Sequence, residues 1–189
     1  LYEIYKNEYM QYLVGQRIEE LMAAEPERQY PEARAMKRRF ILHIGPTNSG
    51  KTYQSVEALK RAKNGVYLGP LRLMALEIFD KLNAGDCPCT LLTGEEFEPM
   101  PGAKVTASTI ELCDYGAKYE VAVIDEAQMI GDRSRGANWT KAILMVNAEV
   151  VHICMAPEAE DIIVKLLSDI AAPFEIIRHE RLTPLSYSG

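Results

Sequence analysis

The chain has 189 residues, of which 48% are hydrophobic and 25% are charged, and its formal net charge is −6. These proportions are ordinary for a globular protein that buries a substantial core. The acidic balance argues against a broad basic coat for nucleic acid, although it leaves room for a local basic groove. No apolar run approaches the ~18 residues of a membrane-spanning helix, so we expect no such helix.

The four cysteines, Cys87, Cys89, Cys113 and Cys154, include no C-x-x-C pair. A structural zinc site needs four well-placed ligands, so we expect reduced thiols and not a zinc site. The start of the chain has no charged-then-apolar leader. Because it begins with Leu1 and not with Met, we expect it to be a piece of a longer protein.

The first 39 residues are predicted to form a helical extension and a linker. Apolar side chains recur at helical spacing over residues 1–24. Residues 25–39 carry two prolines and many charges, which is typical of a linker. We interpret the helix as an ordinary packing helix, with a dedicated partner-binding helix as the alternative. The main domain is therefore expected to span residues 40–189.

Within that domain, short apolar runs alternate with helical patterns. This alternation predicts an α/β fold with a mostly parallel sheet and helices on both faces, and it leaves the order of the strands open. Strands are predicted at residues 40–44, 65–69, 89–93, 103–107, 120–124, 149–154 and 174–178. Helices are predicted at residues 51–63, 71–83, 109–116, 135–147 and 157–170.

The stretch after the first predicted strand fits the pattern G-x-x-x-x-G-K-[ST] at every position from Gly45 to Thr52. The two glycines let backbone N–H groups turn toward an anion, and Lys51 supplies a positive charge for the β- and γ-phosphates. The Thr52 hydroxyl can ligate Mg²⁺, and the following helix directs its positive end at the same place. We predict that ATP is bound by Gly45, Pro46, Thr47, Asn48, Ser49, Gly50, Lys51, Thr52 and Tyr53.

A second acidic motif supports this prediction. The apolar strand at 120–124 ends in Asp125 and Glu126. Asp125 is placed to hold Mg²⁺ together with Thr52, and Glu126 to orient or deprotonate an attacking water. Alone, such a pair can also be a loop cap. Following a complete phosphate loop by roughly seventy residues, the pair predicts a magnesium–nucleotide site, with Lys51 as a further catalytic residue.

Several stretches, in order along the chain, resemble the RNA helicases of the suppressor-of-var-three family. Besides the phosphate loop, they are residues 69–79 (GPLRLMALEIF), 93–96 (TGEE), 108–111 (STIE), 125–128 (DEAQ), 135–142 (RGANWTKA) and 181–185 (RLTPL). The resemblance covers about residues 40–185. It implies the first, RecA-like P-loop NTPase lobe of a superfamily-two, DExH-type RNA helicase, whose second lobe is not in this chain.

The resemblance also implies roles for particular residues. Gln128 would sense the γ-phosphate or bridge to the second lobe, as a further catalytic residue. Single-stranded RNA, or DNA, would contact Pro70, Arg72, Thr93, Gly94, Ser108 and Thr109 through its backbone. The same side chains have simpler interpretations: Ser108 or Thr109 as a helix cap, Gly94 as a turn, Arg72 as a surface charge. A nuclease partner and a monomeric state are further expectations.

The chain departs from the family pattern in two places. Ala127 stands where a larger aliphatic residue is expected, which is harmless for the acidic motif. Met155, Ala156 and Pro157 stand where Gly-acid-Pro is expected. That segment would couple hydrolysis to strand separation, so the departure bears on coupling.

Alternatives to the helicase reading come from two other classes. A thymidine kinase-like enzyme also pairs such a loop with Asp-Glu-Ala-Gln, and Glu126 would then deprotonate a sugar hydroxyl. A nucleotide-gated binding module without turnover is the other. An arginine finger contributes roughly 10³–10⁵ in rate, so a lobe without its partner is expected to bind magnesium–nucleotide and hydrolyse it poorly. We expect a bacterial cytoplasmic location, or the mitochondrial matrix for a eukaryotic protein.

Two kinds of aromatic residue are interpreted as structural. Trp139 is predicted to be core and not a base-stacking platform. His43 is predicted to be a satisfied histidine of a strand. With His152 and His179 it forms no spaced metal cluster.

Overall fold

The computed structural model describes residues 33, 35–46 and 49–180. The helix predicted over residues 1–24, the loop residues Thr47 and Asn48, and the 181–185 motif lie outside the described residues. The boundary expected between residues 39 and 40 stays a prediction. No helix in the described part of the chain is both long and apolar enough to cross a membrane.

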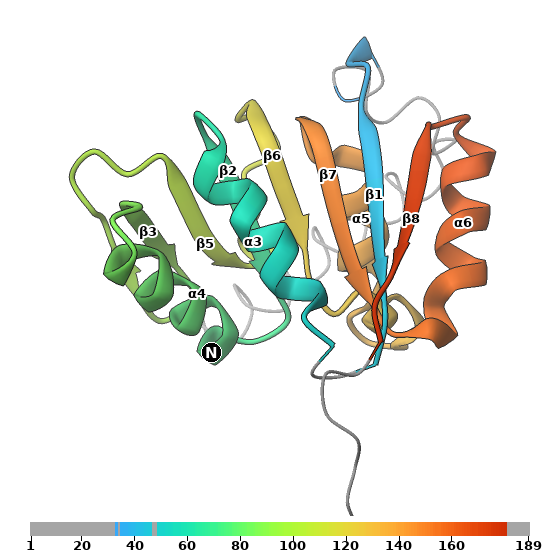
Figure 1. The fold of residues 1–189 in the computed structure, drawn as a ribbon, viewed down its shortest axis with the longest axis horizontal. Coiled ribbons are helices and arrows are strands. Elements are labelled where there is room, and N and C mark those ends of the chain that lie inside the picture. The colour runs from blue at the N-terminus through green and yellow to red at the C-terminus, as the bar shows by residue number, and fades with distance from the viewer. Residues whose placement is uncertain (1–32, 34, 47–48, 181–189) are drawn as a thin grey trace, which may run out of the picture. The chain divides into compact units, whose positions relative to one another are not determined.

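One sheet runs through the domain, as Figure 1 shows. Among the described residues it has eight strands in the order β4-β3-β5-β2-β6-β7-β1-β8. All neighbouring pairs are parallel except β3 and β4. The strands are β1 (Arg39–Ile44), β2 (Gly65–Gly69), β3 (Cys89–Leu92), β4 (Phe97–Glu98), β5 (Val105–Thr109), β6 (Tyr119–Ile124), β7 (Ala148–Met155) and β8 (Phe174–Arg178).

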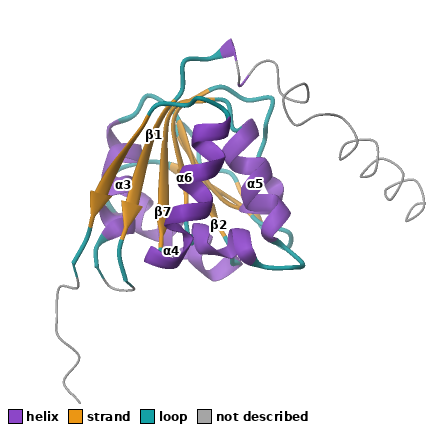
Figure 2. Ribbon diagram, turned by 90° about the vertical axis from the view of Figure 1, so that its right-hand side faces the viewer, coloured by secondary structure: helices purple, strands orange, loops and turns teal. Residues whose placement is uncertain are grey.

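Helices cover both faces of the sheet (Figures 1 and 2), which confirms the predicted α/β architecture. The helices are α3 (Lys51–Arg61), α4 (Arg72–Ala84), α5 (Gly136–Met145) and α6 (Glu160–Asp169). Three short 3₁₀ turns, η1 (Ile110–Leu112), η2 (Ala127–Gly131) and η3 (Pro157–Ala159), follow strands β5, β6 and β7. Side chains of α3 and α4 enter one core cluster, and those of α5 and α6 enter the other.

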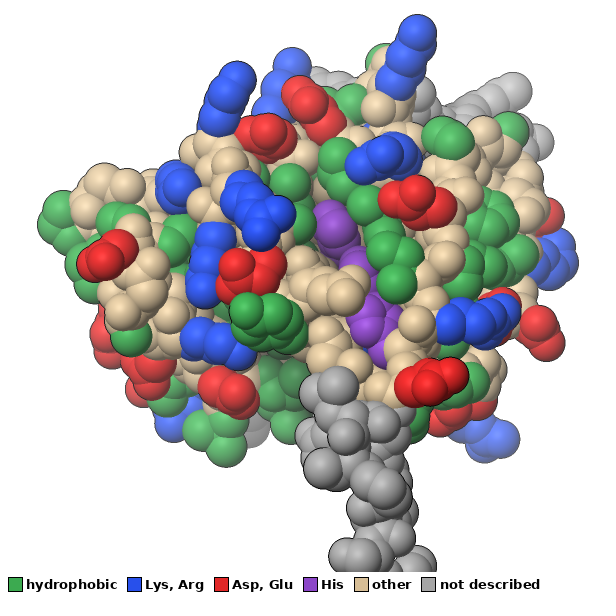
Figure 3. All heavy atoms as spheres, viewed as in Figure 1, with side chains coloured by type: hydrophobic (Ala, Val, Ile, Leu, Met, Phe, Trp, Pro, Cys, Tyr) green, Lys and Arg blue, Asp and Glu red, His purple; other side chains and the backbone are tan. Residues whose placement is uncertain are grey.

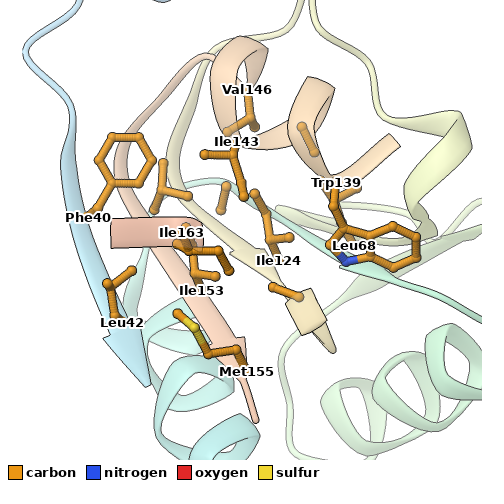
Figure 4. Packing of buried hydrophobic residues seen from close by; sticks show 14 of the residues in the cluster. Phe40, Leu42, Leu68, Ile124, Trp139, Ile143, Val146, Ile153, Met155 and Ile163 are labelled. Carbon is orange, nitrogen blue, oxygen red and sulfur yellow. The ribbon is translucent and has the colours of Figure 1, made fainter. Parts of the chain in front are cut away.

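The alternation of side chains along each strand explains the two cores. On β2, Val66 and Leu68 face the cluster that contains α5 and α6, whereas Tyr67 between them faces α3 and α4. Both faces are buried, so the strands read as continuous apolar runs. Figure 4 shows the cluster that contains α5 and α6 side chains, in which Trp139 packs with Leu68 and Ile124. Trp139 is fully buried, as predicted.

Most predicted elements are confirmed to within a few residues, and those at 65–69 and 174–178 agree at both ends. The helix predicted over 109–116 is wrong: only the turn η1 forms there. The Asp114 carboxylate accepts the N–H of Gly116 at 2.9 Å, a local bond that competes with the helix. The strand predicted at 103–107 begins two residues later, because Gly102 makes a turn with a φ of 75°. The two-residue strand β4 was not predicted.

The order of the strands determines where the motifs meet. Strand β7 lies between β6 and β1. The phosphate loop follows β1 and the acidic motif follows β6, so the two motifs flank the carboxyl end of β7. In parallel sheets, ligands bind outside the carboxyl ends of the strands. The loops after β2, β3 and β5 open at the same edge.

Candidate functional site

The phosphate loop leaves the end of β1 and enters α3 at Lys51. The N–H of Gly45 donates to the carbonyl of Met155 at 3.1 Å, and a Cβ on Gly45 would lie 2.7 Å from the carbonyl oxygen of His179. Gly50 has a φ of 79°, in the left-handed region that glycine tolerates, and directly precedes the helix. Both glycines of the pattern are therefore required by the backbone.

Lys51, the basic residue of the phosphate loop, lies close to an acidic residue. The Nζ of Lys51 lies 3.4 Å from the carbonyl oxygen of Pro46 and 3.9 Å from Oε1 of Glu126. Lys51 is only 5% exposed. This brings together the basic residue of the first motif and an acid of the second.

Asp125 is fully buried and is held from several sides. The Thr52 hydroxyl lies 3.2 Å from each carboxylate oxygen, and the Tyr67 hydroxyl donates to Oδ2 at 2.8 Å. The N–H of Glu126 donates to Oδ1 at 2.9 Å. Burial raises the pKa of Asp125, and the hydrogen bond from Tyr67 acts in the opposite direction. The indole N–H of Trp139 donates to the backbone carbonyl of Asp125 at 3.1 Å.

Glu126 and Gln128 follow strand β6 and are joined by a hydrogen bond between their side chains. Glu126 has a φ of 49°, which is uncommon outside glycine. The amide nitrogen of Gln128 donates to Oε2 of Glu126. The amide oxygen of Gln128 accepts the N–H of Ala156 at 3.1 Å. Gln128 therefore connects the acid to the end of β7, where the chain departs from the Gly-acid-Pro pattern.

One cavity of about 420 Å³ is lined by Ser49, Gly50, Lys51, Thr52, Asp125 and Glu126. Tyr53 also lines it, although its side chain is 55% exposed, and the Nζ of Lys81 lies 5.4 Å from its ring centroid. The remaining lining residues were not predicted from the sequence: they are Tyr67 and the α4 side chains Met74, Glu77 and Ile78. The sequence does contain one signal for Tyr67: it is a tyrosine within an apolar strand, and a buried hydroxyl needs a hydrogen-bond partner.

Two features of the cavity fit a magnesium–nucleotide complex. The Ser49 hydroxyl is buried in the phosphate loop and has no hydrogen-bond partner among the described residues. Thr52 and Asp125 offer hydroxyl and carboxylate oxygens, the hard ligands that Mg²⁺ takes. The site therefore offers a polar group for a phosphate and a donor set for the metal.

The residues expected to contact RNA lie at the carboxyl ends of β2, β3 and β5. Arg72 is paired with Glu95 at 2.7 Å and with Glu96 at 3.3 Å. The Thr93 hydroxyl accepts the N–H of Glu96 at 3.0 Å and so closes the turn that contains Gly94. A Cβ on Gly94 would have no neighbour within 4 Å, so the backbone there is open to close approach.

Thr109 occupies the N-cap position of η1, as the helix-cap interpretation expects. Thr109 makes no side-chain cap bond to η1. The Ser108 hydroxyl is buried and donates to the carbonyl of Thr109 at 3.0 Å. Pro70 is buried, and its carbonyl accepts a hydrogen bond from Arg135 at 2.6 Å.

Arg135 connects this edge to the residues around the cavity. Its guanidinium also donates to Oε1 of Glu111 at 2.7 Å, and its Cζ lies 5.7 Å from the ring centroid of Trp139. Trp139 in turn holds the Asp125 carbonyl. Arg135 belongs to the family motif at residues 135–142, but none of its contacts was predicted from the sequence.

The three histidines form a hydrogen-bonded row beside the phosphate loop. Figure 3 shows histidine side chains in a row on the face that it views. His43 Nδ1 lies 3.0 Å from His179 Nε2, and His43 Nε2 lies 2.8 Å from His152 Nδ1. A neutral imidazole has one donor and one acceptor nitrogen, so a neutral row satisfies these contacts. Burial lowers the pKa of His43 and of His152 to about 4. The prediction of a satisfied His43 is confirmed.

Residues 26–179 match a family described as the DEXQ-box helicase domain of Suv3. The mitochondrial ATP-dependent RNA helicase SUPV3L1 of Danio rerio is 48% identical over 169 residues, covering 87% of this chain and 22% of the relative. SUPV3L1 of Homo sapiens is 48% identical over 165 residues, covering 85% and 21%. The mitochondrial helicase DExH18 of Arabidopsis thaliana is 46% identical over 161 residues, covering 85% and 21%. The chain thus spans about a fifth of the length of these relatives.

Solved structures support the fold. A hypothetical ATP-dependent RNA helicase from Sulfolobus tokodaii superposes with a TM-score of 0.58 at 18% identity, covering 87% of this chain and 56% of that one. The helicase domain of Hef from Pyrococcus furiosus superposes with a TM-score of 0.52 at 16% identity, covering 84% and 38%. At these identities the similarity concerns the fold alone, and it supports the α/β, RecA-like arrangement of the sheet and its helices.

Proposed function

The chain belongs to the DEXQ-box helicase domain family of Suv3, and on this premise we propose that it is the first, ATP-binding motor lobe of an ATP-dependent RNA helicase. The observation that carries the proposal is the meeting of Lys51, Thr52, Asp125 and Glu126 around one cavity. Membership of a helicase family removes the deoxynucleoside kinase alternative.

In the proposed site, the residues divide the work by position. The N–H groups at the start of α3 and the Lys51 ammonium bind the β- and γ-phosphates. Thr52 and Asp125 would hold Mg²⁺, which would neutralise charge on the phosphate oxygens. Glu126 orients the attacking water and accepts its proton.

Gln128 keeps Glu126 at the rim of the cavity through the amide contact described above, and its bond to Ala156 N couples the acid to the end of β7. This coupling contact uses the backbone of Ala156, so it does not depend on the acidic side chain that the family pattern would place there. The second lobe would contribute the arginines that complete the site. The isolated chain therefore binds magnesium–ATP and turns it over slowly.

Single-stranded RNA is the proposed nucleic acid, lying across the loops after β2, β3 and β5. Pro70, Arg72, Thr93, Gly94, Ser108 and Thr109 are its proposed contacts on this lobe. Such contacts go to phosphates and ignore sequence. Because the net charge is −6, affinity for RNA is weak, and it falls as the salt concentration rises. The matched relatives are named mitochondrial, so a eukaryotic parent would act in the mitochondrial matrix.

A binding and turnover assay tests the proposal. The chain is titrated with a fluorescent ATP analogue in Mg²⁺, and ATP consumption is then measured alone, with poly-uridine RNA and with thymidine. We expect nucleotide binding that Lys51→Ala abolishes, slow turnover, and no effect of thymidine. Lys165→Ala is the matched control, because Lys165 pairs with Asp169 on the exposed side of α6. Absence of nucleotide binding, or turnover that requires thymidine, would contradict the proposal.

A further inference from the structure

Tyr67 is a fully buried tyrosine whose hydroxyl has an ionisable partner. It lies in the middle of β2, in register with Ala107 of β5 and Val123 of β6. A buried tyrosine hydroxyl usually finds a hydrogen-bond partner. Here the hydroxyl donates to Oδ2 of Asp125 at 2.8 Å, although the two residues are 58 positions apart in the sequence.

The backbone around Tyr67 makes room for this contact. A Cβ on Gly69 would lie 3.0 Å from Cε1 of the Tyr67 ring and 3.2 Å from its hydroxyl oxygen. The N–H of Asp125 donates to the carbonyl of Leu68 at 2.9 Å. The backbone of Asp125 is therefore held by β2. Because Gly69 has no side chain, there is room beside it for the Tyr67 ring.

Both oxygens of the Asp125 carboxylate have hydrogen-bond partners. Oδ2 accepts from Tyr67 and Oδ1 accepts from the N–H of Glu126, while Thr52 Oγ1 lies 3.2 Å from both. The carboxylate thus already faces the other proposed magnesium ligand. A carboxylate free to rotate would have to be ordered when the ion binds, at a cost in affinity.

We propose that Tyr67 is a positioning residue that orients Asp125 for Mg²⁺ and so sets the strength of magnesium-dependent nucleotide binding. The proposal rests on the proposed magnesium–nucleotide site. Hydrogen-bond partners of metal ligands typically contribute a factor of roughly 10–100 in metal affinity. A ring that only filled the core would change stability and leave the magnesium dependence unchanged.

The test is Tyr67→Phe, which keeps the ring and removes the hydroxyl. Affinity for a fluorescent ATP analogue is measured in EDTA and across a Mg²⁺ titration. We expect the affinity in EDTA to stay within about twofold, and the Mg²⁺ concentration for half-saturation to rise by roughly tenfold or more. Tyr119→Phe is the matched control, because the Tyr119 hydroxyl donates to the carbonyl of Asp114, away from the cavity.

A second variant covers the case in which Tyr67→Phe does not fold. Gly69→Ala keeps the hydroxyl but displaces the ring, so it should raise the half-saturating Mg²⁺ concentration in the same direction. An unchanged magnesium titration in a folded variant, or an equal loss of affinity with and without Mg²⁺, would overturn the positioning role. Failure of the proposed function looks different, because the wild-type chain would then bind no nucleotide or bind it equally well after Lys51→Ala.

Discussion

The proposed nucleotide site and the proposed RNA edge lie along the same end of the sheet, yet their side chains are held in different ways. Asp125 is fully buried and fixed by Thr52, Tyr67 and the backbone. Arg72 is held by Glu95, whose side chain is 75% exposed. Buried networks of satisfied polar groups are rigid, whereas exposed ion pairs contribute little and exchange partners readily.

This difference suits the two proposed tasks. Positioning a water and a metal requires geometry that is in place before the reaction, since misplaced groups lose rate. Contacting a moving strand of RNA requires groups that can release one phosphate and take another. In the structure, the guanidinium of Arg72 is paired with the carboxylates of Glu95 and Glu96. An RNA phosphate would have to displace them to bind Arg72.

The largest expected effect is on the chemistry of the buried site. Glu126→Gln keeps the size of the side chain but removes the base. We expect ATP turnover to fall by roughly 10²–10⁴, with nucleotide affinity nearly unchanged. Single-turnover hydrolysis and fluorescent-nucleotide binding measure the two quantities. Glu158→Gln, on η3, is the control; a Glu126→Gln variant that hydrolyses ATP at the wild-type rate would refute the role.

The next largest effect is expected on folding stability, through the hydrogen bond between the Trp139 indole and the Asp125 carbonyl. Trp139→Phe removes the indole N–H that bonds the Asp125 carbonyl and leaves a buried acceptor unpaired. We expect the free energy of unfolding to fall by about 1–3 kcal/mol. Urea denaturation measures it, with Ile162→Ala as the control because Ile162 is 49% exposed. Equal stabilities for Trp139→Phe and wild type would show that this bond adds nothing.

The histidine row predicts a dependence of stability on pH. Unfolded histidines bind a proton near pH 6.5, whereas His43 and His152 have a pKa of about 4 when folded. Between these values the unfolded chain holds more protons, so the free energy of unfolding falls as pH is lowered from 6.5 to 4. Each ring contributes a slope of up to about 1.4 kcal/mol per pH unit.

A double variant, His43→Asn with His152→Asn, removes these two groups. Its thermal unfolding, measured from pH 7 to pH 5, should depend less on pH than that of the wild type, whatever its stability at pH 7. His179→Asn is the comparison, because His179 is the most exposed ring of the row. Parallel pH profiles for wild type and double variant would contradict the lowered pKa values.

The smallest expected effect is on the exposed pairs of the RNA edge. Replacing both Glu95 and Glu96 by Gln should change stability by no more than about 1 kcal/mol, since exposed ion pairs contribute little. It should, however, strengthen RNA binding by freeing Arg72. Anisotropy of labelled poly-uridine measures the affinity, with Glu175→Gln as the control. Arg72→Gln should weaken binding and reduce the salt slope by about 0.7.

How much of the site could be predicted follows from the range of the interactions. The phosphate loop and the acids after β6 are local patterns, because a tight turn and a helix start need particular residues within a few positions. Helix α3 accordingly begins at Lys51, as predicted. The predicted helix at 109–116 failed because apolar spacing alone does not reveal that Asp114 bonds its own turn.

The sequence by itself determined the fold class, the two nucleotide motifs and the family, since each depends on residue types at fixed local spacing. Only the tertiary structure decided the order of the strands and the contacts that order creates. Tyr67 meets Asp125 across 58 residues, Arg135 meets Pro70 across 65, and His43 meets His152 across 109. Such partners are chosen by which strands lie side by side and which faces pack, and no local pattern in the chain carries that information.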